Sequence, residues 1–122
     1  MIKLMQTDEQ IAQVLRLGRL FYEQSPHNGR TDFIEEDLRQ TLELMAANPM
    51  AAVFVDEFSM CGGLLSPIYF NKDYLIAHEM FWFCEKKEHN GQKVRLMFEH
   101  WAKLSGANSV VMTCLADSHE KR

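Results

Sequence analysis

The segment from Ala77 to Gly106 constrains the fold of this chain more than any other part of its sequence. An apolar run rich in aromatic residues leads into a short polar loop containing Gly91, and an amphipathic stretch with helical spacing follows. With the β-prone run at 109–115, this predicts a strand–helix–strand unit whose two strands are parallel. Because the first N–H groups of a helix lack intrahelical partners and the helix dipole is positive there, the loop can receive an anion such as a phosphate.

The start of the chain predicts a short edge strand followed by a helix. Residues 2–5 form a brief apolar stretch, and Thr7 or Asp8 is suited to cap the helix that follows. Apolar residues then recur at helical spacing until the turn-forming residues 25–29.

A second helix is expected between this turn and the proline that follows Asn48. Thr31 or Asp32 is suited to cap it, and Glu35 stands three residues after Asp32, as in a capping box. Apolar residues inside the segment again follow helical spacing.

The middle of the chain predicts three consecutive strands, over 50–55, 59–66 and 74–84. Residues 67–72 are expected to form a loop between the second and third of them. Gly62 and Gly63 lie together inside the second strand, and paired glycines there suggest a bulge or the close approach of another backbone. Strands that follow one another directly favour antiparallel pairing.

The predicted fold is therefore α+β: one domain over 1–122, with element order β-α-α-β-β-β-α-β and helices on the faces of a mixed sheet. The net charge of −4 argues against nucleic acid as a general partner, and no apolar run is long enough to predict a membrane span. Three cysteines without a CxxC pair indicate reduced thiols in a cytoplasmic protein. No histidine or acidic spacing typical of a metal site is present.

This order of elements resembles the GNAT superfamily of acetyl-coenzyme A-dependent N-acetyltransferases over nearly the whole chain. The sequence FEHWAKLSGANSVVM at 98–112 is similar to the end of the family's cofactor helix and the start of its next strand. The segments LGRLFYEQSP at 17–26 and AHEMFWFC at 77–84 resemble the first helix and fourth strand of members common in phages and prophages. Relative to the family, the C-terminal helix and last two strands are missing.

The resemblance implies that acetyl-CoA is the co-substrate, that no metal takes part, and that an amine on a small molecule or protein accepts the acetyl group. The family's phosphate loop reads R/Q-x-x-G-x-G/A, and its counterpart here is KKEHNG at 86–91, which keeps only the last glycine. The residues implied to bind the cofactor are Phe81, Trp82, Phe83 and Cys84 on the strand, and Lys86, Lys87, His89, Asn90, Gly91, Gln92 and Lys93 at the loop and helix start.

Glu79, on the same strand, is the residue favoured as the general base that takes a proton from the amine, directly or through water. Its apolar and aromatic neighbours are expected to raise the pKa of its carboxyl by desolvation. A backbone N–H of Phe81 or Trp82 is the expected donor to the developing oxyanion. Glu79 also alternates with Phe81 and Phe83, so a solvent-facing or ion-paired carboxylate is the competing interpretation.

Two further interpretations stay open. A catalytically inactive protein-interaction module of the same fold, encoded by a phage, is favoured by the degenerate phosphate loop and the early end of the chain. A different α+β domain would follow if residues 90–93 did not begin a helix. The outer edge of the strand at 109–115 has no expected neighbour, and such an edge invites pairing with a second copy in a homodimer.

Overall fold

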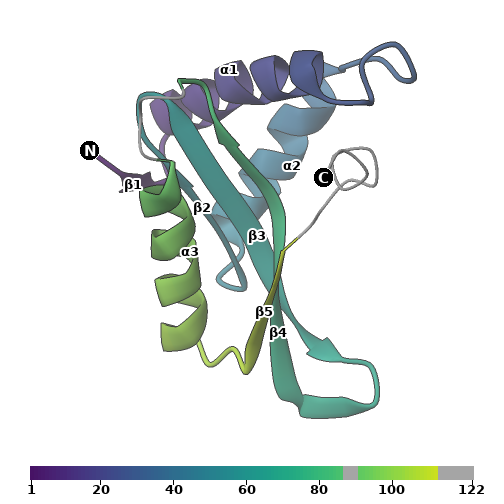
Figure 1. Cartoon of the computed structure of the whole chain (residues 1–122). Helices are drawn as coiled ribbons and strands as arrows, with labels where there is room; N and C mark the ends of the chain where they lie inside the picture. The colour runs from purple at the N-terminus through teal and green to yellow at the C-terminus, as the bar shows by residue number, and fades with distance from the viewer. Residues whose placement is uncertain (87–90, 113–122) are drawn as a thin grey trace.

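The computed structural model describes residues 1–86 and 91–112 of the 122-residue chain. Its elements follow the predicted order (Figure 1). They are β1 (Lys3–Leu4), α1 (Asp8–Gln24), α2 (Glu35–Ala47), β2 (Ala51–Val55), β3 (Ser59–Ile68), β4 (Asn71–Cys84), α3 (Gln92–Leu104) and β5 (Ser109–Met112). Within these residues, no helix has the length and apolar character that crossing a membrane requires.

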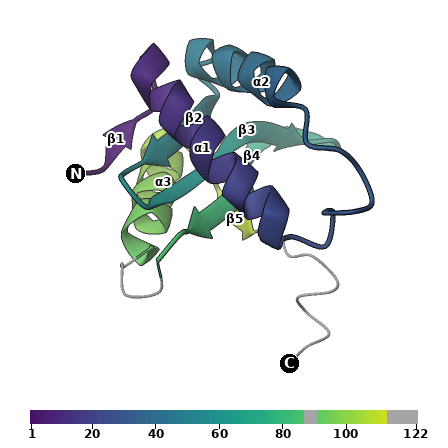
Figure 2. The ribbon, with the colours of Figure 1, turned by 90° about the horizontal axis from the view of Figure 1, so that it is seen from above.

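The strands form one mixed sheet in the order β1-β2-β3-β4-β5, and helices cover both of its faces. The pairs from β1 to β4 are antiparallel and β4 pairs with β5 in parallel, as expected. Helices α1 and α2 pack on one face and α3 packs on the other (Figures 1 and 2). The core is consequently divided by the sheet into two apolar clusters, one on the α1–α2 side and one on the α3 side.

Helix α1 begins where the sequence predicts. The Thr7 hydroxyl accepts a hydrogen bond from the Gln10 N–H at 3.2 Å, and the Gln10 side chain accepts from the Thr7 N–H at 3.0 Å. This reciprocal pair is a capping box, so two otherwise unpaired donors at the helix start are satisfied. Further along α1, Gly18 is buried against α2, where an added Cβ would lie 2.9 Å from a methyl of Leu38. The two helices therefore pack closely at this glycine.

Helix α2 begins later than predicted, and the expected capping box of Asp32 and Glu35 is wrong. The residue at the N-cap position is Ile34, which makes no side-chain cap hydrogen bond. The preceding Phe33 instead packs on Tyr22, with ring centroids 5.5 Å apart. This contact holds the chain in an extended conformation up to the helix. Three acidic residues in the first turn interact favourably with the helix dipole, and they stabilise the helix start where a side-chain cap is lacking.

The expected loop at 67–72 is also wrong, because β3 and β4 form one long hairpin that projects from the body of the domain (Figure 1). Pro67 pairs with Leu75 and Ile68 pairs with Asn71, which leaves only two residues in the turn. A proline lacks the N–H that a strand uses in its ladder and therefore favours a loop in sequence reasoning. The strand accommodates it beside a shift of register between Pro67 and Ile68.

The predicted irregularity at the paired glycines is confirmed as a bulge between β3 and β4. Gly62 pairs with Phe81 but Gly63 pairs with Glu79, so Met80 has no partner residue on β3. A Cβ added to Gly63 would lie 1.9 Å from the backbone oxygen of His78. Only glycine fits there, because the two backbones approach more closely than any side chain permits.

Strand β5 lies at one edge of the sheet, and among the described residues it pairs only with β4. The part of this strand predicted beyond Met112 lies outside the described residues. Pairing of this edge with a second copy stays a prediction.

Candidate functional site

A cavity of about 450 Å³ lies between α1, the segment that joins α1 to α2, the first turn of α2, the start of β3 and residues 79–82 of β4. Its walls are chiefly apolar and aromatic. The lining residues are Val14, Gly18, Phe21, Tyr22, Ser25, His27, Phe33, Leu38, Met60, Glu79, Met80, Phe81 and Trp82. Its volume lies within the range that holds small-molecule ligands.

The bulge of β4 supplies one wall of this cavity. Four consecutive residues, 79–82, line it, which a regular strand would not permit because alternate side chains face opposite sides of a sheet. Met80, which the bulge removes from the pairing with β3, is 42% exposed and borders the opening. The bulge thus brings both backbone and side chains of β4 to the cavity.

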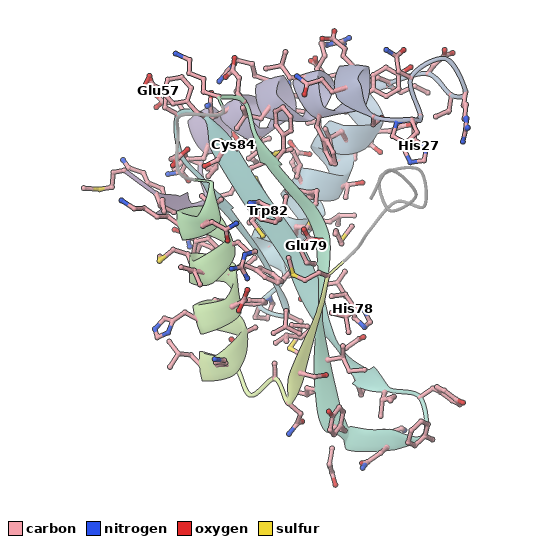
Figure 3. All side chains as sticks on the ribbon, in the orientation of Figure 1. His27, Glu57, His78, Glu79, Trp82 and Cys84 are labelled. Atoms are coloured by element: carbon pink, nitrogen blue, oxygen red, sulfur yellow. The ribbon has the colours of Figure 1, made fainter. Side chains whose placement is uncertain are left out.

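Glu79 is the acidic residue of this wall and is only 3% exposed. Its pairing with Gly63, two positions from the pair of Leu65 with Ala77, places its side chain on the α3 side of the sheet. The expectation of a solvent-facing carboxylate is therefore wrong. Figure 3 shows Cys84, Trp82, Glu79 and His78 in this order along β4. Glu79 lines the cavity and also pairs with Met112 of β5, so it lies where the cavity meets the pairing of β4 with β5.

The N-terminus of α3 is held against the same strand by two contacts. The indole N–H of Trp82 donates a hydrogen bond to the carbonyl oxygen of Gly91 at 3.0 Å. A Cβ on Gly91 would lie 2.8 Å from that of Cys84, so the helix start packs directly on the strand. The first turn of α3 contains no acidic residue, which leaves its dipole available to an anion.

The structure separates the residues predicted to bind the cofactor into different environments. Gln92 and Lys93 are exposed in the first turn of α3, as required of an anion site. The side chain of Phe83 belongs instead to the α1–α2 core, where it stacks on Phe21 with centroids 5.4 Å apart. The Lys86 ammonium lies 4.3 Å from the centre of the Phe58 ring. The predictions for Lys87, His89 and Asn90 fall outside the described residues.

Beyond Met112, the residues that would lie beside Phe81 to Cys84 also fall outside the description. The splaying of β4 from β5, expected to free backbone groups for the cofactor, stays a prediction. So does the oxyanion donor at Phe81 or Trp82. Within the described residues there is no group of three or more histidine, cysteine or acidic side chains that could hold a metal ion.

Sequence reasoning missed the aromatic residues on the opposite wall. Tyr22 and Phe33 come from the end of α1 and the segment before α2, and both look like ordinary apolar residues in the sequence. The Tyr22 hydroxyl donates to the carbonyl oxygen of Thr31 at 2.5 Å, and the Arg19 guanidinium lies 4.7 Å from the centre of the Phe33 ring. These contacts shape the wall, and only the turn residues at 25–29 hinted that the chain reverses here.

A thiol lies on the α3 side of the sheet near the carboxylate of Glu79. Burial first, and then the nearby charge of Glu79, raise the pKa of the Cys61 thiol from its ordinary value of 9.0 to about 12, with a smaller lowering by Arg95 and a smaller raising by Glu99. Arg95 in turn forms an ion pair with Glu99 and lies 5.5 Å from the centre of the Trp82 ring. The α3 side of the sheet therefore contains a small set of interacting polar groups.

The raised pKa of Cys61 predicts a loss of stability in alkali. Above pH 9 the thiol ionises in the unfolded chain but not in the folded one, so the free energy of unfolding falls until the folded pKa near 12 is passed. At pH 10 the loss is about 1.4 kcal/mol. Urea unfolding at pH 8 and pH 10 should show this loss in wild type and in Cys84→Ala but not in Cys61→Ala. An equal loss in Cys61→Ala would contradict the prediction.

The chain has the same fold as several solved structures. Glucosamine-6-phosphate N-acetyltransferase from Arabidopsis thaliana is 14% identical, with a TM-score of 0.64, covering 99% of this chain and 89% of that one. An aminoglycoside N-acetyltransferase in complex with CoA is 9% identical, with a TM-score of 0.72 and coverages of 99% and 80%. A transcriptional regulator from Bacillus halodurans is 10% identical, with a TM-score of 0.73 and coverages of 98% and 86%.

No protein-family model matches the chain, and no curated protein matches it. At these identities, the likeness to solved structures shows a common fold and nothing beyond it.

Proposed function

We propose that this chain, whose fold is that of the GNAT acetyltransferases, is an acetyl-CoA-dependent N-acetyltransferase that acetylates an amine. One observation carries the proposal: β4 connects an aromatic cavity, lined in part by the buried residue Glu79, to the N-terminus of a helix whose first turn contains no acidic residue. A nucleotide diphosphate and a reacting amine can therefore be held along one strand, with the thioester between them.

The start of α3 is the part of the chain suited to the phosphates of the co-substrate. Its first N–H groups and its dipole favour negative charge, and Lys93 adds a cation in the first turn. The contact of Trp82 with Gly91 keeps this end of the helix beside β4. The phosphates would thus lie at the end of the strand whose bulge opens into the cavity.

In the reaction, the amine nitrogen attacks the thioester carbonyl carbon, a C–N bond forms and the C–S bond breaks. The ammonium form cannot attack, so one proton must first leave the nitrogen. Glu79 is proposed to receive it, directly or through a water molecule, because it is the acidic residue among those that line the cavity. A backbone N–H at the β4 bulge would stabilise the charge that develops on the carbonyl oxygen. The thiolate then leaves and takes up the second proton that the nitrogen loses as the amide forms.

Thermal unfolding with and without millimolar acetyl-CoA tests the proposal. A ligand that binds the native state stabilises it by about 2.7 kcal/mol at one hundred times its Kd. For a domain of this size the melting temperature should rise by roughly 10 °C. Replacing Lys93 with glutamate should reduce the rise, whereas the same change at Lys72, on the distant hairpin, should not.

The absence of any rise in melting temperature would reject the enzyme and favour the alternative, an inactive interaction module of the same fold. A rise of equal size in both lysine variants would instead remove the start of α3 as the phosphate site.

A further inference from the structure

We infer that the acceptor amine is a primary amine on an aromatic or alkyl body, and not an amino sugar or another polyhydroxylated amine. This inference rests on the proposed function and adds the chemical class of its substrate. It follows from which hydrogen-bonding groups line the cavity, which charge they carry and how apolar the remaining wall is.

The side-chain donors that line the cavity are already engaged within the protein, except at its exposed rim. The Tyr22 hydroxyl donates to the Thr31 carbonyl at 2.5 Å, and the Ser25 hydroxyl donates to the Tyr22 carbonyl at 2.8 Å. The indole N–H of Trp82 donates to the Gly91 carbonyl at 3.0 Å. His27 is exposed and lies at the edge. A ligand with several hydroxyl groups would therefore bury acceptors and donors without partners, which is unfavourable.

The charge of the cavity favours a cationic ligand. Among the described residues that line the cavity, Glu79 is the only acidic one, and it is almost completely buried. Aromatic residues also line the opposite wall, and an aromatic ring such as that of Tyr22 attracts an ammonium group placed over its face. An anionic ligand would meet this acidic residue, and the described part of the chain contributes no lysine or arginine to the lining.

The remaining wall is apolar, and its area determines how affinity should vary with the ligand. Phe81, Met60, Leu38 and Val14 contribute aliphatic or aromatic surface to a cavity of about 450 Å³. Each methylene group transferred from water to such a surface should improve binding by about fourfold until the cavity is filled. A longer aliphatic chain or a phenyl ring on the amine should therefore be favoured.

A series of primary amines tests the inference: ethylamine, butylamine, hexylamine, phenethylamine and glucosamine. Release of free coenzyme A from acetyl-CoA gives kcat/KM for each amine. We expect an increase of about fourfold per methylene from ethylamine to hexylamine. Phenethylamine should exceed glucosamine by at least about a hundredfold, the product of three to four such steps. A flat series, or glucosamine as good as phenethylamine, would overturn the inference.

Phe33 provides a variant in the cavity wall that leaves β4 and its Glu79 unchanged. Phe33→Ala should lower kcat/KM for phenethylamine by about tenfold or more, while ethylamine, too short to reach this wall, should change by less than about twofold. Phe33→Leu keeps an apolar side chain, so its kcat/KM for phenethylamine should lie between those of the wild type and Phe33→Ala. Phe70→Ala, at the exposed hairpin tip, serves as the control. An unchanged ratio of the two amines in Phe33→Ala, with the melting temperature of the variant preserved, would also overturn the inference.

Melting temperatures separate the failure of this inference from failure of the proposed function. Each amine is added alone, and acetyl-CoA is added alone. If acetyl-CoA raises the melting temperature but the rise produced by the amines does not grow with their chain length, the substrate class is wrong and the acetyltransferase proposal stands. If the rise produced by the amines grows with chain length but acetyl-CoA does not change the melting temperature, the cavity still binds apolar amines and the acetyltransferase proposal is wrong.

Discussion

Glu79→Gln is expected to reduce turnover by about 10²- to 10⁴-fold while leaving acetyl-CoA binding unchanged. The substitution keeps the size of the side chain but removes the group that accepts the proton of the amine. The start of α3, where the phosphates are proposed to bind, lies at the other end of the strand segment and keeps its contact with Trp82. Steady-state rates and the melting shift with acetyl-CoA are therefore the two measurements to compare.

Glu43→Gln provides the matched control, since Glu43 is exposed on α2 and does not line the cavity. A second measurement shows that the Glu79 variant is folded and altered where intended. The charge of Glu79 raises the pKa of the Cys61 thiol, so Glu79→Gln should lower that pKa and make the thiol react faster with an alkylating reagent in alkali. A variant with the altered thiol and full turnover would leave Glu79 as a structural carboxylate and remove it from the mechanism.

Gly63→Ala is expected to have the largest effect on stability, a loss of about 3 kcal/mol or more. The added Cβ would lie 1.9 Å from the backbone oxygen of His78, and no rotation of a side chain can relieve a clash with backbone. Either the bulge opens or β3 and β4 separate, and both changes also disturb the cavity wall at Met80.

Gly29→Ala separates this clash from the general cost of replacing a glycine. Gly29 has a φ of +89° and nothing within 4 Å of an added Cβ, so only the backbone conformation is strained. That strain is worth roughly 1–2 kcal/mol. Urea unfolding of both variants should give the larger loss for Gly63→Ala. A smaller loss there than in Gly29→Ala would show that the two strands are not closely apposed at the bulge.

Local signals in the sequence predicted the elements whose formation depends on neighbouring residues. The capping candidates Thr7 and Asp8, with the helical spacing after them, predicted the observed start of α1. The apolar runs and the glycine pair predicted the strands and the bulge. The N-terminus of α2 was missed because the competing contact of Phe33 with Tyr22 joins residues eleven positions apart, which no local capping signal reveals.

The candidate site was predicted only in part, for the same reason. The sequence placed Glu79 on β4 and Gly91 at the start of α3, because both follow from the strand–loop–helix pattern. It did not place the Glu79 side chain, since one unpaired residue at Met80 reverses the alternation of faces along the strand. The sequence likewise did not predict the contact of the exposed Lys86 with the Phe58 ring, because the two residues lie at the ends of different strands.

The sequence by itself determined the order of helices and strands, the parallel unit around α3 and the position of the bulge, because periodicity, caps and glycines act over a few residues. Only the tertiary structure decided which residues surround the cavity. Its walls come from α1, the segment before α2, β3 and β4, and they meet through the register of the sheet and the packing of Gly18 on Leu38. Contacts between segments distant in sequence depend on the whole set of packed elements, so no local pattern specifies them.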